Sequence, residues 1–210
     1  MKVSVPRESL KRALQWFRCI LFTGAALTLG YCGFVLLDAW LFQQRQARNL
    51  EHLLTEGSPS QQEPPAIPVD GLIGRIEIAR VGLSAMVVEG TDRAKLRRAA
   101  GHIQGTAVPG QPGNIGIAAH RDTFFRPLRN LRLNDIVTLT TSRAAYHYRV
   151  VSMRVVNPTE VSVLNPSEHE ILTLVSCYPF YFVGPAPNRF IVRAERVTGR
   201  HRTGKAECNL

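Results

Sequence analysis

Apolar and polar positions divide this chain into two parts with different periodicities. Near the N-terminus, an uncharged apolar run covers residues 19–37, and a short apolar stretch follows Asp38 as far as Phe42. From residue 71 onward, apolar residues occur in short runs, several of them alternating with polar ones, and Gly, Pro and Asn separate the runs. The first pattern is typical of one long helix and the second of β-strands. We therefore predict an N-terminal helix followed by a domain that is mainly β.

The second part is predicted to contain seven or eight short strands and little helix. A helix is expected at 91–100, with Thr91 or Asp92 as its N-cap, and a loop rich in Gly and Pro at 101–113. One or two helical turns are expected at 124–131, and a short helix within 157–166. Many short strands with little helix imply a closed β-barrel or a sandwich. The predicted strands cover residues 73–79, 83–89, 114–120, 136–141, 146–156, 171–177 and 189–196, and the fourth and fifth form a hairpin.

The apolar N-terminal segment is long enough to cross a membrane. Residues 19–42 suffice, as a helix, for a bilayer core of about 30 Å. Lys and Arg outnumber acidic residues in 1–18, which favours a cytoplasmic N-terminus and export of the rest. A cleaved signal peptide is the alternative, but no small-x-small cleavage site follows the apolar run. We interpret 1–18 as a cytoplasmic basic tail and 19–42 as a retained transmembrane anchor.

Two further segments separate the anchor from the β domain and end the chain. Residues 43–54 have helical composition and are expected to continue the anchor as a polar stalk. Residues 55–70 contain four prolines together with Gly, Ser and Gln, which is typical of a stiff linker. The predicted organisation is therefore a stalk and Pro-rich linker at 43–70, the β domain at 71–198, and a basic tail at 199–210.

The charge of the chain limits the classes of partner. The whole chain has a net charge of +10, and residues 71–198 contain 16 Lys and Arg against 9 Asp and Glu. A basic domain is compatible with nucleic acid, or with an anionic membrane or cell-wall surface. The sequence contains no signature of a nucleic-acid-binding module, and the apolar anchor favours the surface. We expect membrane lipid, and no nucleic acid, among the partners.

Cys177 is the one cysteine in the predicted β domain. The other three cysteines are Cys19, Cys32 and Cys208. No C-x-x-C spacing occurs, so neither a zinc site nor a redox dithiol is indicated. A lone cysteine is most often a small buried apolar residue. Cys177, however, ends the apolar run 171–175 after one intervening residue, where a loop could admit a substrate.

A cysteine nucleophile needs a proton acceptor and a group that stabilises the oxyanion. His120 ends the apolar run 115–119, much as Cys177 ends its own strand, so two neighbouring strands could bring both residues to one rim. A structural role for a histidine at a strand end is the alternative. The other three histidines of the domain occur in an alternating strand, in a polar loop and in the glycine-rich loop, and are His147, His169 and His102.

Arg189 is the candidate for the oxyanion-binding group. It opens the strand that follows Cys177, 12 residues later, and hairpin geometry would bring the two together. An Arg at this place can donate two hydrogen bonds to a substrate oxygen. For Arg193 a surface role is preferred, and the direction of the Asp122 side chain, which could orient the histidine, stays open.

These motifs together resemble those of a sortase. The segment Thr173–Cys177, the segment Arg189–Val192 twelve residues further on, and the upstream segment Ala119–Asp122 match in order. Tyr178–Phe180 and Gly184–Pro187 are most similar to class D sortases. The resemblance covers about residues 71–197. Two positions depart from the family pattern, which has Thr where this chain has Ser176 and usually Gly where it has Ala119.

The resemblance implies an eight-stranded sortase-type β-barrel, with short helices, after one N-terminal transmembrane helix. It implies a cysteine transpeptidase in which Cys177 attacks an LPxTx-like sorting signal to form a thioacyl-enzyme. His120 would act as acid and base, and Arg189 would stabilise the oxyanion. The partners would be proteins with C-terminal sorting signals and an amine acceptor, either a cell-wall precursor or a protein lysine. No cofactor is expected, and calcium is not indicated because the acidic residues are scattered.

Two other classes of function remain open at this point. One is a membrane-anchored thiol hydrolase, in which water resolves the thioacyl-enzyme and releases surface proteins. The other is a non-catalytic envelope-binding barrel in which Cys177 is buried and inert. In all three cases we expect a single-pass protein of the cell membrane, with its N-terminus in the cytoplasm and its β domain outside.

Overall fold

The computed structural model describes residues 7–55, 71–182 and 184–197. The chain forms two compact units, with the division between Phe42 and Gln43. Most of the predicted linker and the whole of the predicted basic tail at 199–210, with Cys208, lie outside the described residues.

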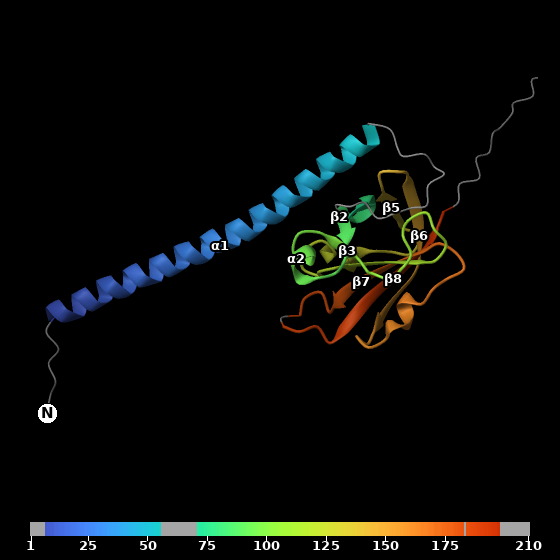
Figure 1. Ribbon diagram of the computed structural model, residues 1–210. Coiled ribbons are helices and arrows are strands. Elements are labelled where there is room, and N and C mark those ends of the chain that lie inside the picture. The colour runs from blue at the N-terminus through green and yellow to red at the C-terminus, as the bar shows by residue number, and fades with distance from the viewer. Residues whose placement is uncertain (1–6, 56–70, 183, 198–210) are drawn as a thin grey trace, which may run out of the picture. The chain divides into compact units, whose positions relative to one another are not determined.

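Helix α1 (Arg7–Thr55) forms the N-terminal unit as far as Phe42 (Figure 1). Its residues from Gln43 onward are assigned to the second unit. The helix contains the predicted span 19–42 and is long and apolar enough to cross a membrane. Large apolar side chains such as Trp16, Phe34 and Trp40 are more than half exposed on this candidate membrane span. The helical continuation through 43–54 is confirmed. The helix begins at Arg7, earlier than the apolar run at 19–37. The residues before that run include Leu, Lys, Arg and Gln, which all have high helix propensity.

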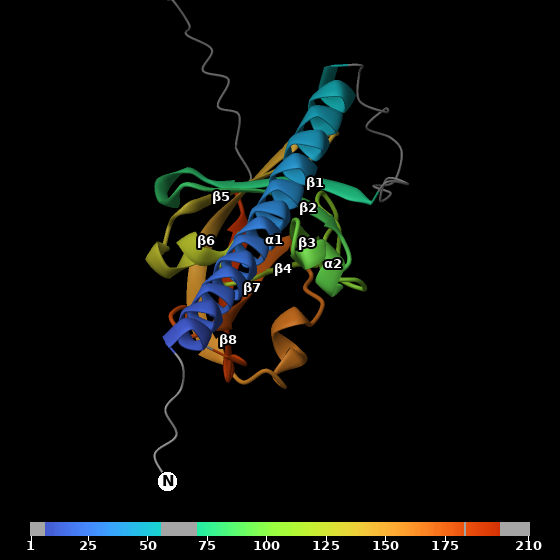
Figure 2. The same ribbon diagram turned by 90° about the vertical axis from the view of Figure 1, so that its left-hand side faces the viewer.

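Eight strands form the closed barrel that the sequence predicts (Figures 1 and 2). Around the barrel their order is β1-β2-β3-β4-β7-β8-β6-β5, and β5 pairs with β1 to close it. The pairs β2–β3 and β4–β7 are parallel, and the others are antiparallel. The strands are β1 (Leu72–Ile78), β2 (Leu83–Glu89), β3 (Ala100–His102), β4 (Asn114–Ala119), β5 (Ile136–Thr140), β6 (Ala145–Val156), β7 (Ile171–Tyr178) and β8 (Asn188–Arg196).

The segment between β2 and β4 differs from the prediction. Helix α2 (Arg93–Leu96) is shorter than the predicted helix at 91–100, although Asp92 caps it by accepting from the backbone N–H groups of Ala94 and Lys95. Ala100 begins β3, which lies partly inside the predicted loop at 101–113. Strand β3 has only three residues, too few for a periodic pattern, and its pairing with β2 and β4 holds it in place.

Three short 3₁₀ helices complete the domain. They are η1 (Ala79–Val81), η2 (Arg126–Asn130) and η3 (Val161–Leu164). The last two confirm the helical turns predicted at 124–131 and within 157–166.

Alternate residues of each strand fill the inside of the barrel. On β7, Leu172 and Leu174 are fully buried in the main core, together with Ile115 and Ile117 of β4 and Val192 of β8. Since successive side chains of a strand point to opposite faces, the residues between them face outward. Val175 and Ile191 accordingly belong to a separate small cluster with η3.

One glycine allows the barrel to close between β1 and β5. A Cβ added at Gly74 would lie 2.1 Å from the backbone oxygen of Thr140, which no real side chain could tolerate. The same residue marks an irregularity in the pairing of β1 with β2. Gly74 is therefore required by close backbone approach rather than by the hydrophobic pattern.

An ion pair joins η1 to the start of β5. Arg80 Nε and Nη2 donate to Asp135 Oδ1 and Oδ2 at 2.5 and 2.6 Å, and the Arg132 backbone N–H donates to Oδ2 at 2.7 Å. The Asp135 side chain is 7% exposed. Hydrogen bonds from Arg80 and from the Arg132 backbone N–H outweigh the opposing effect of burial and lower the pKa of Asp135. The ionised carboxylate is therefore the form that the fold stabilises.

We predict that Asp135→Asn lowers the melting temperature of the barrel, by on the order of 5 °C near neutral pH. Folding lowers the pKa of Asp135. The carboxylate therefore contributes fully to the free energy of unfolding above its unfolded-state pKa of about 4, and this contribution is lost as the pH falls through its folded-state pKa. Urea unfolding between pH 7 and pH 3 should show the two proteins converging in acid. Glu160→Gln, which removes an exposed ion pair with Arg154, is the control with little expected effect. A stability difference that stays constant down to pH 3 would contradict the assignment.

Candidate active site

The three predicted site residues meet where β7 pairs with its two neighbours. Cys177 on β7 lies directly opposite Arg189 on the antiparallel strand β8. On the other side of β7, Ser176 is paired with Ala119 on the parallel strand β4. His120 is the next residue after Ala119, as Cys177 is the next residue after Ser176. The pairings thus bring the three residues to one end of three adjacent strands.

The strand alternation assigns Cys177 to the outside of the barrel. Leu172, Leu174 and Ser176 are buried toward the inside, with Ser176 only 2% exposed. Cys177 alternates with them and shares its face with Val175. Val175 belongs to the outer cluster with η3. By the same alternation Arg189 shares the outer face with Ile191. A substrate could therefore approach along the outer wall, without entering the core.

The environments of these side chains are partly open to solvent. Cys177 is a free thiol of intermediate exposure. His120 and Arg189 are also half-buried. Arg189 Nη1 donates to the backbone oxygens of Asn188 and Ala186 at 3.0 and 3.3 Å. These bonds hold the guanidinium beside the β7–β8 connection. Cys177 is thus not fully buried, unlike the cysteine that the non-catalytic alternative requires.

A buried polar network fixes η3 (orange in Figure 2) beside these strands. The Thr173 hydroxyl donates to Asn114 Oδ1 at 2.6 Å, and Asn114 Nδ2 donates to the backbone oxygens of Val163 and Asn165 at 3.0 and 3.1 Å. Asn114 and Thr173 are 3% and 0% exposed. The bonds join β4, β7 and η3, so they set the position of the wall beside the outer face. The sequence did not predict these hydrogen bonds, because their partners are far apart along the chain.

Gly116 allows two apolar side chains to reach the outer face of β4. A Cβ at this position would lie 3.1 Å from Ile103 Cδ1 and from Leu164 Cδ2. Leu164 belongs to η3, and Ile103 follows β3. A larger residue would push these neighbours away from β4 and change the wall that η3 forms.

His102 has a structural environment that differs from that of His120. It is 1% exposed, and its Nδ1 contacts Glu89 Oε2 at 2.6 Å. Its Nε2 contacts the backbone oxygen of Ala107 at 2.8 Å and the Thr106 hydroxyl at 3.1 Å. Since a carbonyl oxygen only accepts, the contact with Ala107 requires a hydrogen on Nε2. Both ring nitrogens are therefore engaged inside the protein.

The remaining candidates lie away from Cys177 or are exposed. His147 is exposed on β6 and contacts Thr138, as expected for a residue on a strand face. His169 is exposed in the segment before β7. Asp122, the candidate for orienting His120, is also exposed. Arg193 is paired with Thr173, four residues before Cys177 on β7.

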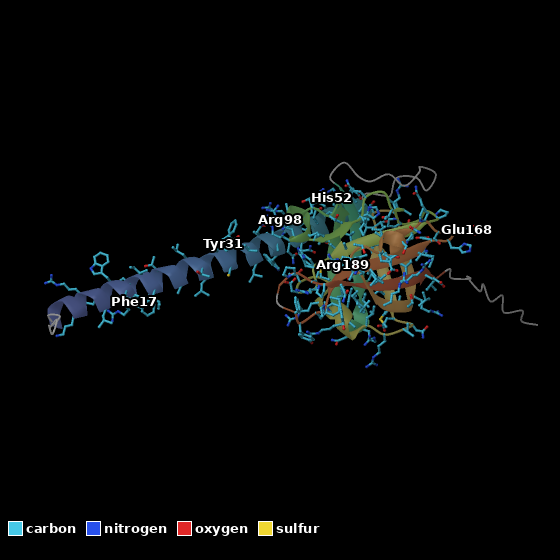
Figure 3. All side chains as sticks on the ribbon, turned by 90° about the horizontal axis from the view of Figure 1, so that it is seen from below. Phe17, Tyr31, His52, Arg98, Glu168 and Arg189 are labelled. Carbon is cyan, nitrogen blue, oxygen red and sulfur yellow. The ribbon has the colours of Figure 1, made fainter. Side chains whose placement is uncertain are left out.

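A cavity of about 650 Å³ lies at the other end of β7, away from Cys177. Its lining includes Ile171, at the start of β7, and Arg196, at the end of β8. Figure 3 shows Glu168, which also lines it, well separated from Arg189 on the barrel. The cavity is thus distinct from the predicted site.

Within the described part of the chain, no three His, Cys, Asp or Glu side chains come together as a metal site would require.

Comparison with known proteins identifies the family. The model of the sortase domain matches residues 76–197, which include the whole barrel except the first residues of β1. This chain belongs to the sortase family.

Individual sortases agree with this assignment. Sortase D of Bacillus subtilis (strain 168) is 36% identical over 126 residues, which cover 60% of this chain and 64% of that protein. Sortase A of Listeria monocytogenes is 30% identical over 112 residues, covering 51% of this chain and 50% of that protein. This chain thus spans between half and two thirds of the length of these curated sortases.

A solved sortase has the same fold along nearly its whole length. It is the Clostridium perfringens protein described as a Sortase D5 transpeptidase, 25% identical to this chain with a TM-score of 0.64. The match covers 75% of this chain and 99% of that structure. The predicted closed eight-stranded sortase barrel is therefore confirmed, whereas the roles of Cys177, His120 and Arg189 stay predictions.

We predict that His102→Ala destabilises the barrel by on the order of 3 kcal/mol, because it leaves the Glu89 carboxylate without its buried partner. Chemical unfolding of the purified variant measures this loss. His147→Ala, at an exposed position, should leave the unfolding midpoint nearly unchanged. Wild-type stability of His102→Ala would show that the buried pair contributes nothing to the fold.

Proposed function

We propose that this chain is a membrane-anchored cysteine transpeptidase that cleaves an LPxTx-like sorting signal and transfers the protein to an amine. The acceptor belongs to the cell envelope or to another protein. The proposal rests on family membership and on one structural observation: β7 is paired with β8 at Cys177–Arg189 and with β4 at Ser176–Ala119. This pairing supports the proposal because it makes Cys177, His120 and Arg189 neighbours at one rim.

In the first half of the reaction, the Cys177 thiol gives its proton to His120, and the sulfur attacks the carbonyl carbon of the Thr residue in the sorting signal. A C–S bond forms, and negative charge develops on the carbonyl oxygen. Arg189 donates hydrogen bonds to that oxygen. The C–N bond then breaks as His120 gives a proton to the departing amine. The product is a thioester between Cys177 and the N-terminal part of the client protein.

In the second half, an amine attacks the thioester carbon. His120 takes a proton from the amine, a new C–N bond forms, and the C–S bond breaks to restore the Cys177 sulfur. Water can replace the amine in the same step, which gives hydrolysis instead of transfer. The balance between the two outcomes depends on whether an amine reaches the thioester first, so the acceptor determines which reaction is observed.

The proposed location follows from α1. One apolar N-terminal helix could span a membrane, and the basic residues that precede its apolar part favour a cytoplasmic N-terminus. The barrel is then outside the cell membrane, where envelope precursors and exported client proteins are available.

We predict that Cys177→Ala abolishes cleavage of a fluorogenic LPxTx-type peptide without unfolding the barrel, since only a half-buried sulfur is lost. The measurement is turnover by the full-length protein in detergent, with and without an added amine such as triglycine. Wild-type protein should form the amide product only with the amine, and a Cys19→Ser, Cys32→Ser variant should retain this activity. Undiminished cleavage by Cys177→Ala would sink the proposal, and hydrolysis that no amine diverts would favour a thiol hydrolase.

We predict that His120→Ala and Arg189→Ala each lower kcat/KM by on the order of 10²-fold or more, the usual effect of removing an acid–base or oxyanion group. The matched controls are His147→Ala, on an exposed strand face, and Arg193→Ala, on the same strand as Arg189. Both controls should stay within about twofold of wild type. Equal losses for Arg189→Ala and Arg193→Ala would indicate a general charge effect and contradict the role of Arg189.

A further inference from the structure

Arg121 follows His120 directly and binds the loop that connects β7 to β8. Its Nη1 donates to the backbone oxygen of Pro179 at 2.9 Å. Its Nη2 donates to the backbone oxygens of Phe182 and Gly184 at 2.7 and 2.9 Å. The guanidinium also lies over the Phe182 ring, 5.8 Å from its centroid. One side chain thus holds three points of the loop backbone.

This loop links two of the proposed catalytic residues. It leaves β7 directly after Cys177 and Tyr178 and enters β8 directly before Arg189. Arg189 itself donates to the last part of the connection, at Ala186 and Asn188. Arg121 holds the earlier part from the side of β4. The loop is therefore bound from both sides, and its position does not depend on Arg189 alone.

The contacts of Arg121 match the chemistry of a guanidinium. Its donors form a rigid planar fork that can serve several carbonyl oxygens at once, whereas the single ammonium of Lys cannot span the same three. Because Arg121 is the next residue after His120, the bonds tie the histidine-bearing segment to the loop that joins Cys177 to Arg189. Errors of about 1 Å in the alignment of reacting groups can cost 10²-fold in rate.

We propose that Arg121 is a positioning residue, which keeps His120 aligned with Cys177 and Arg189 by holding the β7–β8 loop. The inference rests on the proposed function for its effect on rate, and on the contacts alone for its effect on the loop. It assigns to Arg121 no contact with the substrate.

Arg129 provides a matched comparison, because it contacts the same loop from outside it. Its guanidinium lies over the Tyr181 ring, 5.3 Å from the centroid, and it belongs to η2. Arg121→Gln and Arg129→Gln therefore remove the same charge from beside the same loop. The first also removes the three bonds to the loop backbone.

The test uses full-length protein in detergent and two measurements. Hydrogen exchange of the peptide covering residues 178–190 reports the loop without any substrate, and steady-state kinetics with an LPxTx-type peptide report alignment. Arg121→Gln should raise exchange in this peptide by about fivefold or more, with β1 and β2 unchanged. It should lower kcat by about tenfold and change KM by less than about threefold. Arg121→Lys should recover only part of kcat, and Arg129→Gln should resemble wild type.

Several results would overturn the inference. Unchanged exchange in the loop of Arg121→Gln would show that the contacts do not hold it. Equal losses of kcat in Arg129→Gln, or full recovery in Arg121→Lys, would show that charge alone matters. Exchange that rises equally throughout the barrel would show a role in stability instead of positioning. Wild-type protein that turns over no sorting peptide would refute the proposed function, while the exchange comparison would still decide whether Arg121 holds the loop.

Discussion

The parallel pairing of β4 with β7 is the contact on which the arrangement of the site depends. It sets Ala119 beside Ser176 and so aligns the ends of the two strands, while the antiparallel β7–β8 pairing adds Arg189 opposite Cys177. A shift of one residue in either register would turn one set of side chains from the outer wall to the core. The buried residues of β4, β7 and β8 prevent such a shift, because each strand has a continuous inner row of apolar side chains. The positions of Cys177, His120 and Arg189 on the outside of the barrel are therefore fixed by packing on the inside.

The two places where the chain departs from the sortase pattern are neighbours in this pairing. Ala119 stands where the family usually has Gly, and Ser176 where it has Thr, and the two residues are register partners. Both are buried, and the Ser176 hydroxyl donates to the backbone oxygen of Ala119 at 3.4 Å. Relative to the pattern, one methyl group is added on β4 and one is removed on β7. The volume of the pair is thus conserved, which is the kind of exchange that a close-packed interior tolerates best.

The sequence predicted the barrel strands and their ends because these leave local signals, and the three candidate site residues were chosen at such strand ends. A polar residue after an apolar run marks a strand end, as at His120, and a short turn between two strands predicts the hairpin that pairs Cys177 with Arg189. Strand β3 was missed, since a three-residue strand is held only by its pairing with its neighbours. The predicted helix at 91–100 was therefore also too long. The contacts of Asn114, Thr173 and Arg121 were not predicted either. Their partners lie about 50 to 60 residues away along the chain, and no local pattern reports such a contact.

The outward direction of Cys177 has a consequence for the size of what it can hold. A molecule joined to this sulfur would extend from the wall of the barrel into open space, because the inward row of β7 is already filled by Leu172, Leu174 and Ser176. Under the proposed function, a folded protein could therefore remain attached to Cys177 while only a short extended peptide lies along the outer face. Recognition would then involve a few residues near the sulfur, and the bulk of the attached protein would be left free.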